Sequence, residues 1–322
     1  MVIRIRPRKL RARRRWVTAG VLRDMPELPD IVVYIEALEK RVVGETLRRV
    51  RVTAPQLMRT YDPPTSALEG QVVCGLRRVG KRIVFEFADE LFLIIHLMVS
   101  GRLAWAKPGS AVPKKVGLAG LDFEDGSLIL REASTRKRAG MWIVRGEGSL
   151  AEHDRGGIEP LGADLGAFAE RLTRENRTLK RALTDPRIFS GIGNAYSDEI
   201  LHAARLSPVK LTNRLTEAEI ERLFVATQRL LIEWTDRLRE EVGDGFPDKG
   251  VTAFRPDMAV HGKYGLPCPV CGSKVQRIVY ASNETNYCAA CQTGGKLLAD
   301  RSLSRLLKDD WPKTLEELEE RN

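Results

Sequence analysis

Two Cys-x-x-Cys pairs near the carboxyl end constrain the fold more than any other feature of this sequence. Cys268 and Cys271 form the first pair and Cys288 and Cys291 the second, with sixteen residues between them. That spacing is typical of four thiolates that bind one tetrahedral zinc ion. Because four protein ligands leave no coordination position for water, we expect a structural Zn²⁺ that organises a short hairpin. Cys74 stands alone, and an odd cysteine count favours a cytosolic metal-binding protein over a secreted disulfide framework.

The segment PELPD, residues 26–30, is the second strong signal. If translation begins at Met25 and that methionine is removed, Pro26 becomes a terminal secondary amine with a pKa of about 8. Such an amine can attack C1′ of a sugar, and the resulting iminium keeps its positive charge and promotes elimination of the flanking phosphates. Glu27 and Asp30 would supply carboxylates for proton transfer. The alternative is an ordinary proline-rich helix entry.

The basic charge of the chain is concentrated in residues 1–24, which carry eight Arg, one Lys and one Asp out of a formal net charge of +10. The rest of the chain is close to neutral, so total charge does not itself indicate nucleic-acid binding, and local basic faces must supply it. We interpret this leader as the product of a mis-assigned start codon. An organelle transit peptide and a disordered nucleic-acid-binding arm are the alternatives.

Apolar periodicity predicts an α+β fold. From Pro29 the apolar residues fall at helical spacing until Gly44 ends the helix. Short β-branched or aromatic segments follow and should form an antiparallel β-sandwich, at 46–52, 71–79, 82–88, 91–99, 118–124 and 127–132. Helical spacing returns at 165–172, 179–183, 195–204 and 217–238. The longest apolar runs have the length of strands, so we expect no membrane span.

The segment SGIGNAYSDEI, residues 190–200, reads as a glycine-bounded turn that leads into a helix. Gly191 and Gly193 let the backbone approach a ligand closely, and helix-terminal N–H groups can bind phosphate. Asn194 adds a side-chain donor at the same place. The alternative is a simple tight turn between two helices.

The motif MPELPD, the SGIGNAYSDEI segment and the four-cysteine hairpin occur in this order over residues 25–292. In this combination the chain resembles the bacterial, zinc-finger-containing formamidopyrimidine-DNA glycosylase and endonuclease VIII family. The resemblance implies an N-terminal antiparallel β-sandwich, a helix–two-turn–helix domain and a zinc-binding β-hairpin. It further implies a cytoplasmic, nucleoid-associated monomer that binds double-stranded DNA at a damaged base or an abasic site and acts as glycosylase and lyase.

The resemblance divides the chain into a leader and four further parts. These are a basic leader (1–24), a catalytic β-sandwich domain (25–150), a DNA-binding helix–two-turn–helix domain (165–250), a zinc finger (251–292) and a C-terminal helical extension (293–322). The polar stretch 151–164 is the expected linker. Residues 243–250, GDGFPDKG, are expected to form a mobile loop.

The resemblance also assigns roles to catalytic residues. Pro26 matches the nucleophile and Glu27 the acid/base at the deoxyribose, with Asp30 as a possible assistant. Lys81 lies at an expected hairpin turn beside Gly80, where a solvated turn lysine is the ordinary interpretation. By resemblance Lys81 instead supplies electrostatic and proton-transfer assistance at the damaged nucleoside.

Several DNA contacts are likewise implied by the resemblance. Asn194 matches the residue that holds the phosphate at the flipped nucleotide, and Lys180 matches a second residue on the phosphate side. The hairpin enters the minor groove, and the remaining candidates for DNA contact are Lys137, Arg138, Lys274, Arg277 and Asn283.

Some residues depart from the family pattern. Asn283 replaces the arginine of the finger, Ala139 replaces an intercalating aromatic, Val99 replaces the methionine that fills the void, and Asp30 is one methylene shorter than the usual glutamate. The partly missing wedge favours one alternative function, a narrower abasic-site lyase or crosslink-processing glycosylase. A second alternative, a non-catalytic lesion-binding protein, follows if the leader is retained and Pro26 stays acylated.

The chain continues for 31 residues after Cys291. Leucines form an apolar face, and an acidic helix is expected from Trp311 and Pro312 onward. We expect this extension to pack on the helical domain, with recruitment of a partner as the alternative.

Overall fold

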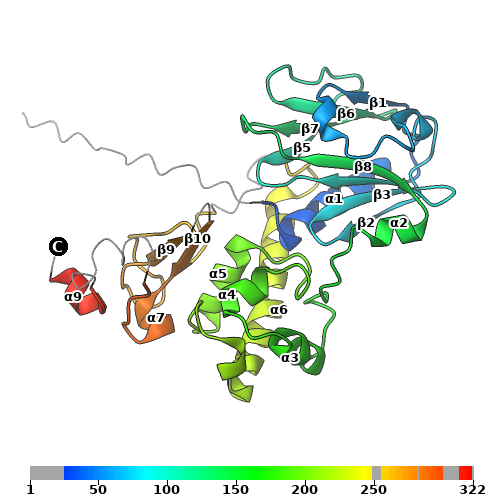
Figure 1. Ribbon diagram of the computed structural model, residues 1–322. Coiled ribbons are helices and arrows are strands. Elements are labelled where there is room, and N and C mark those ends of the chain that lie inside the picture. Colours follow the sequence, from blue (N-terminus) through cyan, green and yellow to red (C-terminus); the bar gives the residue numbers. More distant parts are fainter. Residues whose placement is uncertain (1–24, 249–254, 281–282, 300–311, 321–322) are drawn as a thin grey trace, which may run out of the picture.

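The computed structural model describes residues 25–248, 255–280, 283–299 and 312–320 (Figure 1). The leader and its three interpretations therefore lie outside the described residues. So does part of the expected mobile loop, of which residues 243–248 form a turn followed by irregular backbone.

Helix α1 (Leu28–Val42) begins within the PELPD motif, directly after Glu27, and lies between the two halves of the molecule. Its apolar residues Ile31, Ile35 and Leu38 pack into the core of the β-sandwich. Leu28, at its first turn, belongs instead to the core of the helical domain. The helix therefore fixes the amino end of the motif at the junction of the two domains.

The N-terminal domain consists of two four-stranded antiparallel sheets with the orders β1-β6-β7-β5 and β2-β3-β4-β8. The strands are β1 (Arg49–Val52), β2 (Gly75–Val79), β3 (Arg82–Phe87), β4 (Leu91–His96), β5 (Gly101–Ala106), β6 (Gly117–Asp122), β7 (Ser127–Glu132) and β8 (Gly140–Arg145). Apolar side chains from both sheets meet in one buried core. The expected sandwich is confirmed.

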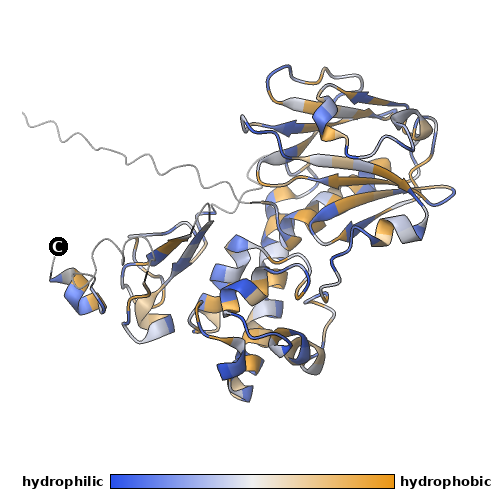
Figure 2. Ribbon diagram, viewed as in Figure 1, coloured by the Kyte–Doolittle hydropathy of each residue, from blue (hydrophilic) through white to orange (hydrophobic). Residues whose placement is uncertain are grey.

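Two strands, β5 and β8, were not expected from the sequence. Strand β8 pairs with β4 from Leu91↔Arg145 to His96↔Gly140, and it buries side chains on both faces. Helix α2 (Glu147–Ala151) covers its outer face, where Leu150 packs beside Val144. A strand that is covered on both faces shows no period-two alternation, so only a run of apolar residues can mark it, and in β8 that run is limited to residues 141–144. Figure 2 shows apolar residues along the strands of this sheet.

The second domain is helical, as expected. It contains α3 (Leu165–Thr173), α4 (Leu179–Thr184), α5 (Asn194–Ala203) and α6 (Glu217–Val242). Helix α6 begins with a capping box at Thr216 and Glu219. It contacts both α1 and α5, so it joins the two domains along one side. Within the described chain, no helix has the length and apolarity needed to cross a membrane.

The third part is the cysteine hairpin, formed by β9 (Gln276–Tyr280) and β10 (Asn283–Tyr287) and followed by α7 (Ala289–Thr293). The C-terminal helix α9 (Leu315–Glu319) lies beside it (Figure 1). Leu315 and Leu318 pack with Leu297 and Tyr287, and the amide of Leu297 donates to the carbonyl of Lys313 at 2.8 Å.

The expectation that the extension packs on the helical domain is therefore wrong for its described part. It completes a small apolar core against the finger, because a hairpin of this size cannot bury enough surface alone. The helix begins at Leu315, later than expected. Trp311 lies outside the described residues, and so do three leucines of the expected apolar face, Leu303, Leu306 and Leu307.

Candidate active site and nucleic-acid interface

Glu27 precedes α1 and is buried against the first turn of α5. Its carboxylate accepts backbone N–H bonds from Gly193 at 2.6 Å, Ala195 at 2.8 Å and Tyr196 at 3.3 Å. The backbone follows the same path, since the amide of Leu28 donates to the carbonyl of Gly191 at 3.0 Å. The two sequence motifs, 166 residues apart, therefore form one site.

Lys81 reaches the same point from the sandwich. It occupies the two-residue turn between β2 and β3, where Gly80 has a φ of +60°. A Cβ atom placed on Gly193 would lie 2.3 Å from the Lys81 ammonium nitrogen and 2.5 Å from the carboxyl carbon of Glu27. A lysine and a carboxylate thus meet over a residue that must lack a side chain.

Arg78 joins this turn to the glycine segment. Its guanidinium donates to the carbonyl of Gly80 at 2.6 Å and to the hydroxyl of Ser190 at 3.3 Å, and it forms an ion pair with Glu159. Gly191 has a φ of +81°, and a Cβ there would lie 2.8 Å from that of Leu28. Both close approach and a left-handed backbone therefore require glycine at this position.

A cavity of about 260 Å³ opens beside these groups. Its lining includes Met25, Lys81, His96 and Gly191. Met25 is bonded to the nitrogen of Pro26, which is itself buried. That nitrogen is an amide in the 322-residue chain, and its lone pair is delocalised into the carbonyl of Met25.

His96 is a member of this cavity that the sequence did not single out. Its Nδ1 accepts the backbone N–H of Met98 at 2.9 Å. Burial, reinforced by the positive charges of Arg82 and Lys81, lowers the pKa of His96 to about 3. The imidazole is therefore neutral at physiological pH.

Asp30 lies on the other side of the motif. One carboxylate oxygen accepts the backbone N–H of Glu27 at 2.9 Å, and the other faces the guanidinium of Arg255 at 3.5 Å. Burial raises the pKa of Asp30, although the amide of Glu27 and the charge of Arg255 oppose the shift. Asp30 therefore supports the backbone of Glu27. Arg255 joins α1 only through the tertiary structure, and no pattern in the sequence indicated it.

The two candidates on α4 and α5 lie close together. Asn194 is the first residue of α5, and within the described residues its half-buried side-chain amide makes no hydrogen bond. Lys180 donates to the carbonyl of Asn194 at 2.6 Å and to Ser197 Oγ at 2.8 Å, and it forms an ion pair with the buried Asp198. The amide of Asn194 is thus available to a ligand, whereas the ammonium of Lys180 is engaged by the protein.

Lys137 and Arg138 lie in the irregular segment before β8. The buried carboxylate of Glu132 accepts the backbone N–H groups of Arg138 at 2.8 Å and Ala139 at 3.0 Å, and Lys137 donates to the carbonyl of Glu132. Arg138 is exposed and Ala139 is buried in the sandwich core. The basic side chain therefore remains at the surface, and no side chain projects from position 139.

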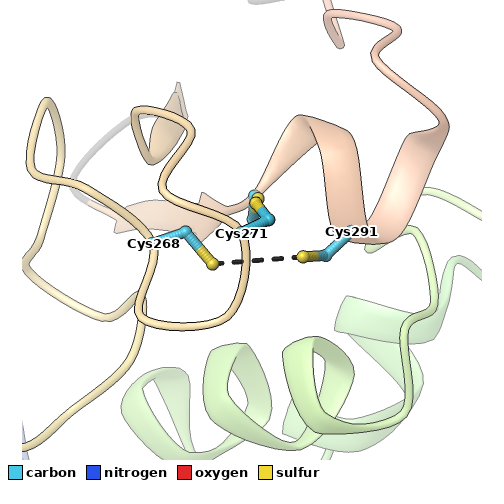
Figure 3. Close-up of side chains that lie close together, drawn as sticks. Cys268, Cys271 and Cys291 are labelled. Atoms are coloured by element: carbon cyan, nitrogen blue, oxygen red, sulfur yellow. Dashed lines mark hydrogen bonds between the residues drawn. The ribbon is translucent and has the colours of Figure 1, made fainter.

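The four cysteines converge as the spacing predicted. Their sulfur atoms all lie within 4.8 Å of one another, with Cys271 and Cys288 3.4 Å apart. Figure 3 shows the thiol of Cys268 facing that of Cys291, and the two sulfur atoms lie 4.0 Å apart. Four converging thiols fit a structural tetrahedral Zn²⁺.

His202 of α5 adds a contact that the sequence did not indicate. Its Nε2 lies 3.3 Å from the sulfur of Cys268. On the outer surface of the finger, Arg277 stacks over the ring of Tyr264 at 4.2 Å and pairs with Glu284 at 3.2 Å, while Lys274 is exposed. The side chain of Asn283 lies outside the described part of the chain.

Three family models match successive parts of this architecture. They are the formamidopyrimidine-DNA glycosylase N-terminal domain over residues 25–141, the H2TH domain of the same enzymes over 157–237, and the zinc finger found in FPG and IleRS over 265–294. The chain belongs to the formamidopyrimidine-DNA glycosylase family. A formamidopyrimidine-DNA glycosylase from Symbiobacterium thermophilum is 33% identical over 277 residues, which cover 83% of this chain and 89% of the relative.

Solved structures of the Lactococcus lactis enzyme agree with this assignment. Its complex with DNA that contains an abasic site is 28% identical and superposes with a TM-score of 0.72, covering 83% of this chain and 99% of that one. A mutant of the same enzyme bound to DNA that contains Fapy-dG is 29% identical, also with a TM-score of 0.72, and covers 83% and 100%. Members of this family are DNA repair glycosylases, and abasic-site lyase activity is part of the family.

Proposed function

We propose that the protein excises oxidised or ring-opened bases that are flipped out of duplex DNA, and then cleaves the strand, with Pro26 as the nucleophile. One observation carries this proposal: Glu27 and Lys81 meet at Gly193, beside the cavity whose wall includes Met25. Removal of Met25 would place the amine of Pro26 at that cavity. The proposal therefore applies to the chain that begins at Met25.

The reaction proceeds in two stages. The Pro26 nitrogen forms a bond to C1′ while the bond from C1′ to the base breaks, and the base leaves with the electron pair and takes a proton. Glu27, as acid, protonates the deoxyribose while the base leaves, and opening of the sugar ring then gives an iminium. Loss of a proton from C2′ then expels the 3′ phosphate, because the cationic nitrogen accepts the electrons. Lys81 supplies positive charge and proton transfer at the sugar.

The DNA contacts follow from the same geometry. Asn194 holds the phosphate beside the flipped nucleotide through its side-chain amide, because the backbone N–H groups of Gly193, Ala195 and Tyr196 at the same end of α5 are already bound to Glu27. Arg138 and the exposed Lys274 contact neighbouring phosphates. Zn²⁺, when bound by the four cysteines, keeps the hairpin folded for insertion. We further infer a cytoplasmic, nucleoid-associated location.

A narrower substrate range is the second candidate, and Ala139 favours it. Its methyl group is buried in the sandwich core, so it cannot fill the space that a flipped base leaves in the duplex. The cost of unstacking is smallest where the base is already absent or damaged. An enzyme without this wedge would therefore favour abasic sites or distorted lesions.

Borohydride trapping tests the nucleophile. It reduces an iminium to a stable amine and so links the protein covalently to DNA that carries an abasic site. We expect crosslinking by the Met25-start chain and none by the 322-residue chain if that chain keeps its leader, because a tertiary amide cannot attack C1′. Pro26→Gly in the short form should react more weakly, through a primary amine.

Intact mass of each protein supplies the control, since it shows whether the leader or Met25 has been removed. Equal trapping by both intact forms would contradict the assignment of Pro26 and would identify another amine, with Lys81 examined first by Lys81→Met. If the Met25-start chain binds the DNA but is not trapped by borohydride, the non-catalytic alternative is favoured.

A further inference from the structure

The ammonium of Lys180 has all its hydrogen-bonding capacity filled by the protein. A lysine carries three N–H donors. They are taken by the carbonyl of Asn194, the hydroxyl of Ser197 and the carboxylate of Asp198. Its side chain is 12% exposed and that of Asp198 is fully buried. No donor remains for a phosphate, so Lys180 acts on the first turn of α5 and only through it on DNA.

Asp198 has a second set of partners, which come from the zinc-finger part of the chain. The carboxylate oxygen that does not face Lys180 accepts Nδ1–H of His261 at 2.7 Å and the backbone N–H of Asn286 at 3.1 Å. The side-chain amide of Asn286 approaches the same oxygen at 3.4 Å. Asn286 is in β10, two residues before Cys288.

The neighbouring carboxylate extends this contact. Glu199 accepts three backbone N–H groups, from Ala259 at 2.8 Å, Val260 at 2.9 Å and His261 at 2.8 Å. These bonds dock the finger on α5 but do not involve Lys180. Burial opposes ionisation of Asp198, but Lys180 and His261 together hold its pKa below the ordinary value. A buried anion of this kind is stable only while its donors stay in place.

We propose that Asp198 is a positioning residue that couples docking of the zinc hairpin to the phosphate grip of Asn194. One oxygen orients Lys180, which holds the carbonyl of Asn194, and the other binds Asn286 of the hairpin. If the hairpin detaches, Asp198 loses His261 and Asn286 and the start of α5 loosens. This inference rests on the proposed role of Asn194 as phosphate clamp.

The coupling through Asp198 can be tested by measuring DNA affinity. The full Met25-start protein is titrated with a duplex that contains a stable tetrahydrofuran abasic analogue, at several salt concentrations. Asn194→Ala should weaken affinity about tenfold, the loss expected for one hydrogen bond to a charged group. Asp198→Asn and Lys180→Met should each weaken affinity by a similar factor. Combined with Asn194→Ala, neither should weaken affinity further than Asn194→Ala does alone. Lys180→Met should leave the salt slope unchanged, whereas loss of a direct phosphate contact would lower it by about 0.9.

Hydrogen exchange supplies a measurement that a purely local role would not change. Asp198→Asn should increase exchange in residues 283–287 and 194–198 together while zinc remains at one per chain. Lys210→Met is the control, because Lys210 also forms a lysine–carboxylate ion pair in the same domain, with Glu219, but that pair is more exposed and does not contact the first turn of α5. It should change neither affinity nor exchange at these positions.

The outcomes separate the two proposals. Unchanged affinity in Asn194→Ala would remove the phosphate clamp itself. A loss in Asn194→Ala without a loss in Asp198→Asn, faster exchange confined to the hairpin, or a lower salt slope in Lys180→Met would each overturn the coupling and leave the clamp intact. If either Lys180→Met or Asp198→Asn alone unfolds, the double variant that combines them removes both buried charges and allows the same measurements.

Discussion

Replacing Gly193 by alanine tests the geometry of the catalytic centre most directly. The backbone at Gly193, with φ −133° and ψ −153°, is extended and can be adopted by alanine, so the substitution adds no backbone strain. The added methyl group, however, would lie 2.3 Å from the Lys81 nitrogen and 2.5 Å from the Glu27 carboxyl carbon. Ordinary van der Waals contact begins near 3.4 Å, so these groups must move about 1 Å further away from the methyl group.

The two groups differ in how they can respond. Lys81 ends in a flexible chain and can move, but Glu27 is held by three backbone N–H bonds, one of them from Gly193 itself. Overpacking of this kind costs about 1–3 kcal/mol of folding free energy. A displacement of about 1 Å in a catalytic group lowers the rate by about 100-fold. We therefore expect a folded protein with at least that loss in base excision.

Single-turnover base excision and thermal unfolding of the Met25-start protein measure these effects. Gly162→Ala is the matched control, because no heavy atom lies within 4 Å of the added Cβ and no positive φ is involved. It should retain wild-type rates. A Gly193→Ala protein with the wild-type melting temperature and a rate within about threefold would refute the convergence of Glu27 and Lys81 at this residue.

Three further predictions follow from individual groups. Chelation of zinc should abolish DNA binding, while circular dichroism should show that the β-sandwich stays folded. Stoichiometric zinc in the double variant Cys288→Ser with Cys291→Ser would contradict the assigned ligands. Glu27→Gln should block base excision yet spare strand cleavage at a preformed abasic site, which needs no leaving base; equal loss of both reactions in gel assays would argue against its assigned role. Because the folded-state pKa of His96 is about 3, against 6.5 ordinarily, stability is complete above pH 6.5 and falls by about 1.4 kcal/mol per pH unit below it. His96→Gln should reduce that slope in urea unfolding between pH 7 and 5, and an unchanged slope would contradict burial of a neutral imidazole.

Local patterns in the sequence established most of the architecture. Cysteine spacing indicated the metal site because four thiolates on two short turns have few other geometries. Helical periodicity placed α1 and α3 to α6 within a few residues, since each buries one face. The β-sandwich followed from six short segments, but β5 and β8 were missed. Strand β8 is covered on both faces and therefore lacks alternation, and its apolar run is only residues 141–144.

The tertiary structure decided which polar groups meet, because their partners lie far apart along the chain. Glu27 is bound by N–H groups more than 160 residues away, and Asp30 meets Arg255 across 225 residues. Asp198 was not singled out from the sequence, yet the fold gives its carboxylate partners on α4 and in the zinc-finger part of the chain. The sequence by itself determined the elements and the kind of chemistry, since these depend on local spacing. Burial and long-range pairing determined that Lys180 pairs with a carboxylate and that Gly193 must lack a side chain. Both depend on distances that only the folded chain sets.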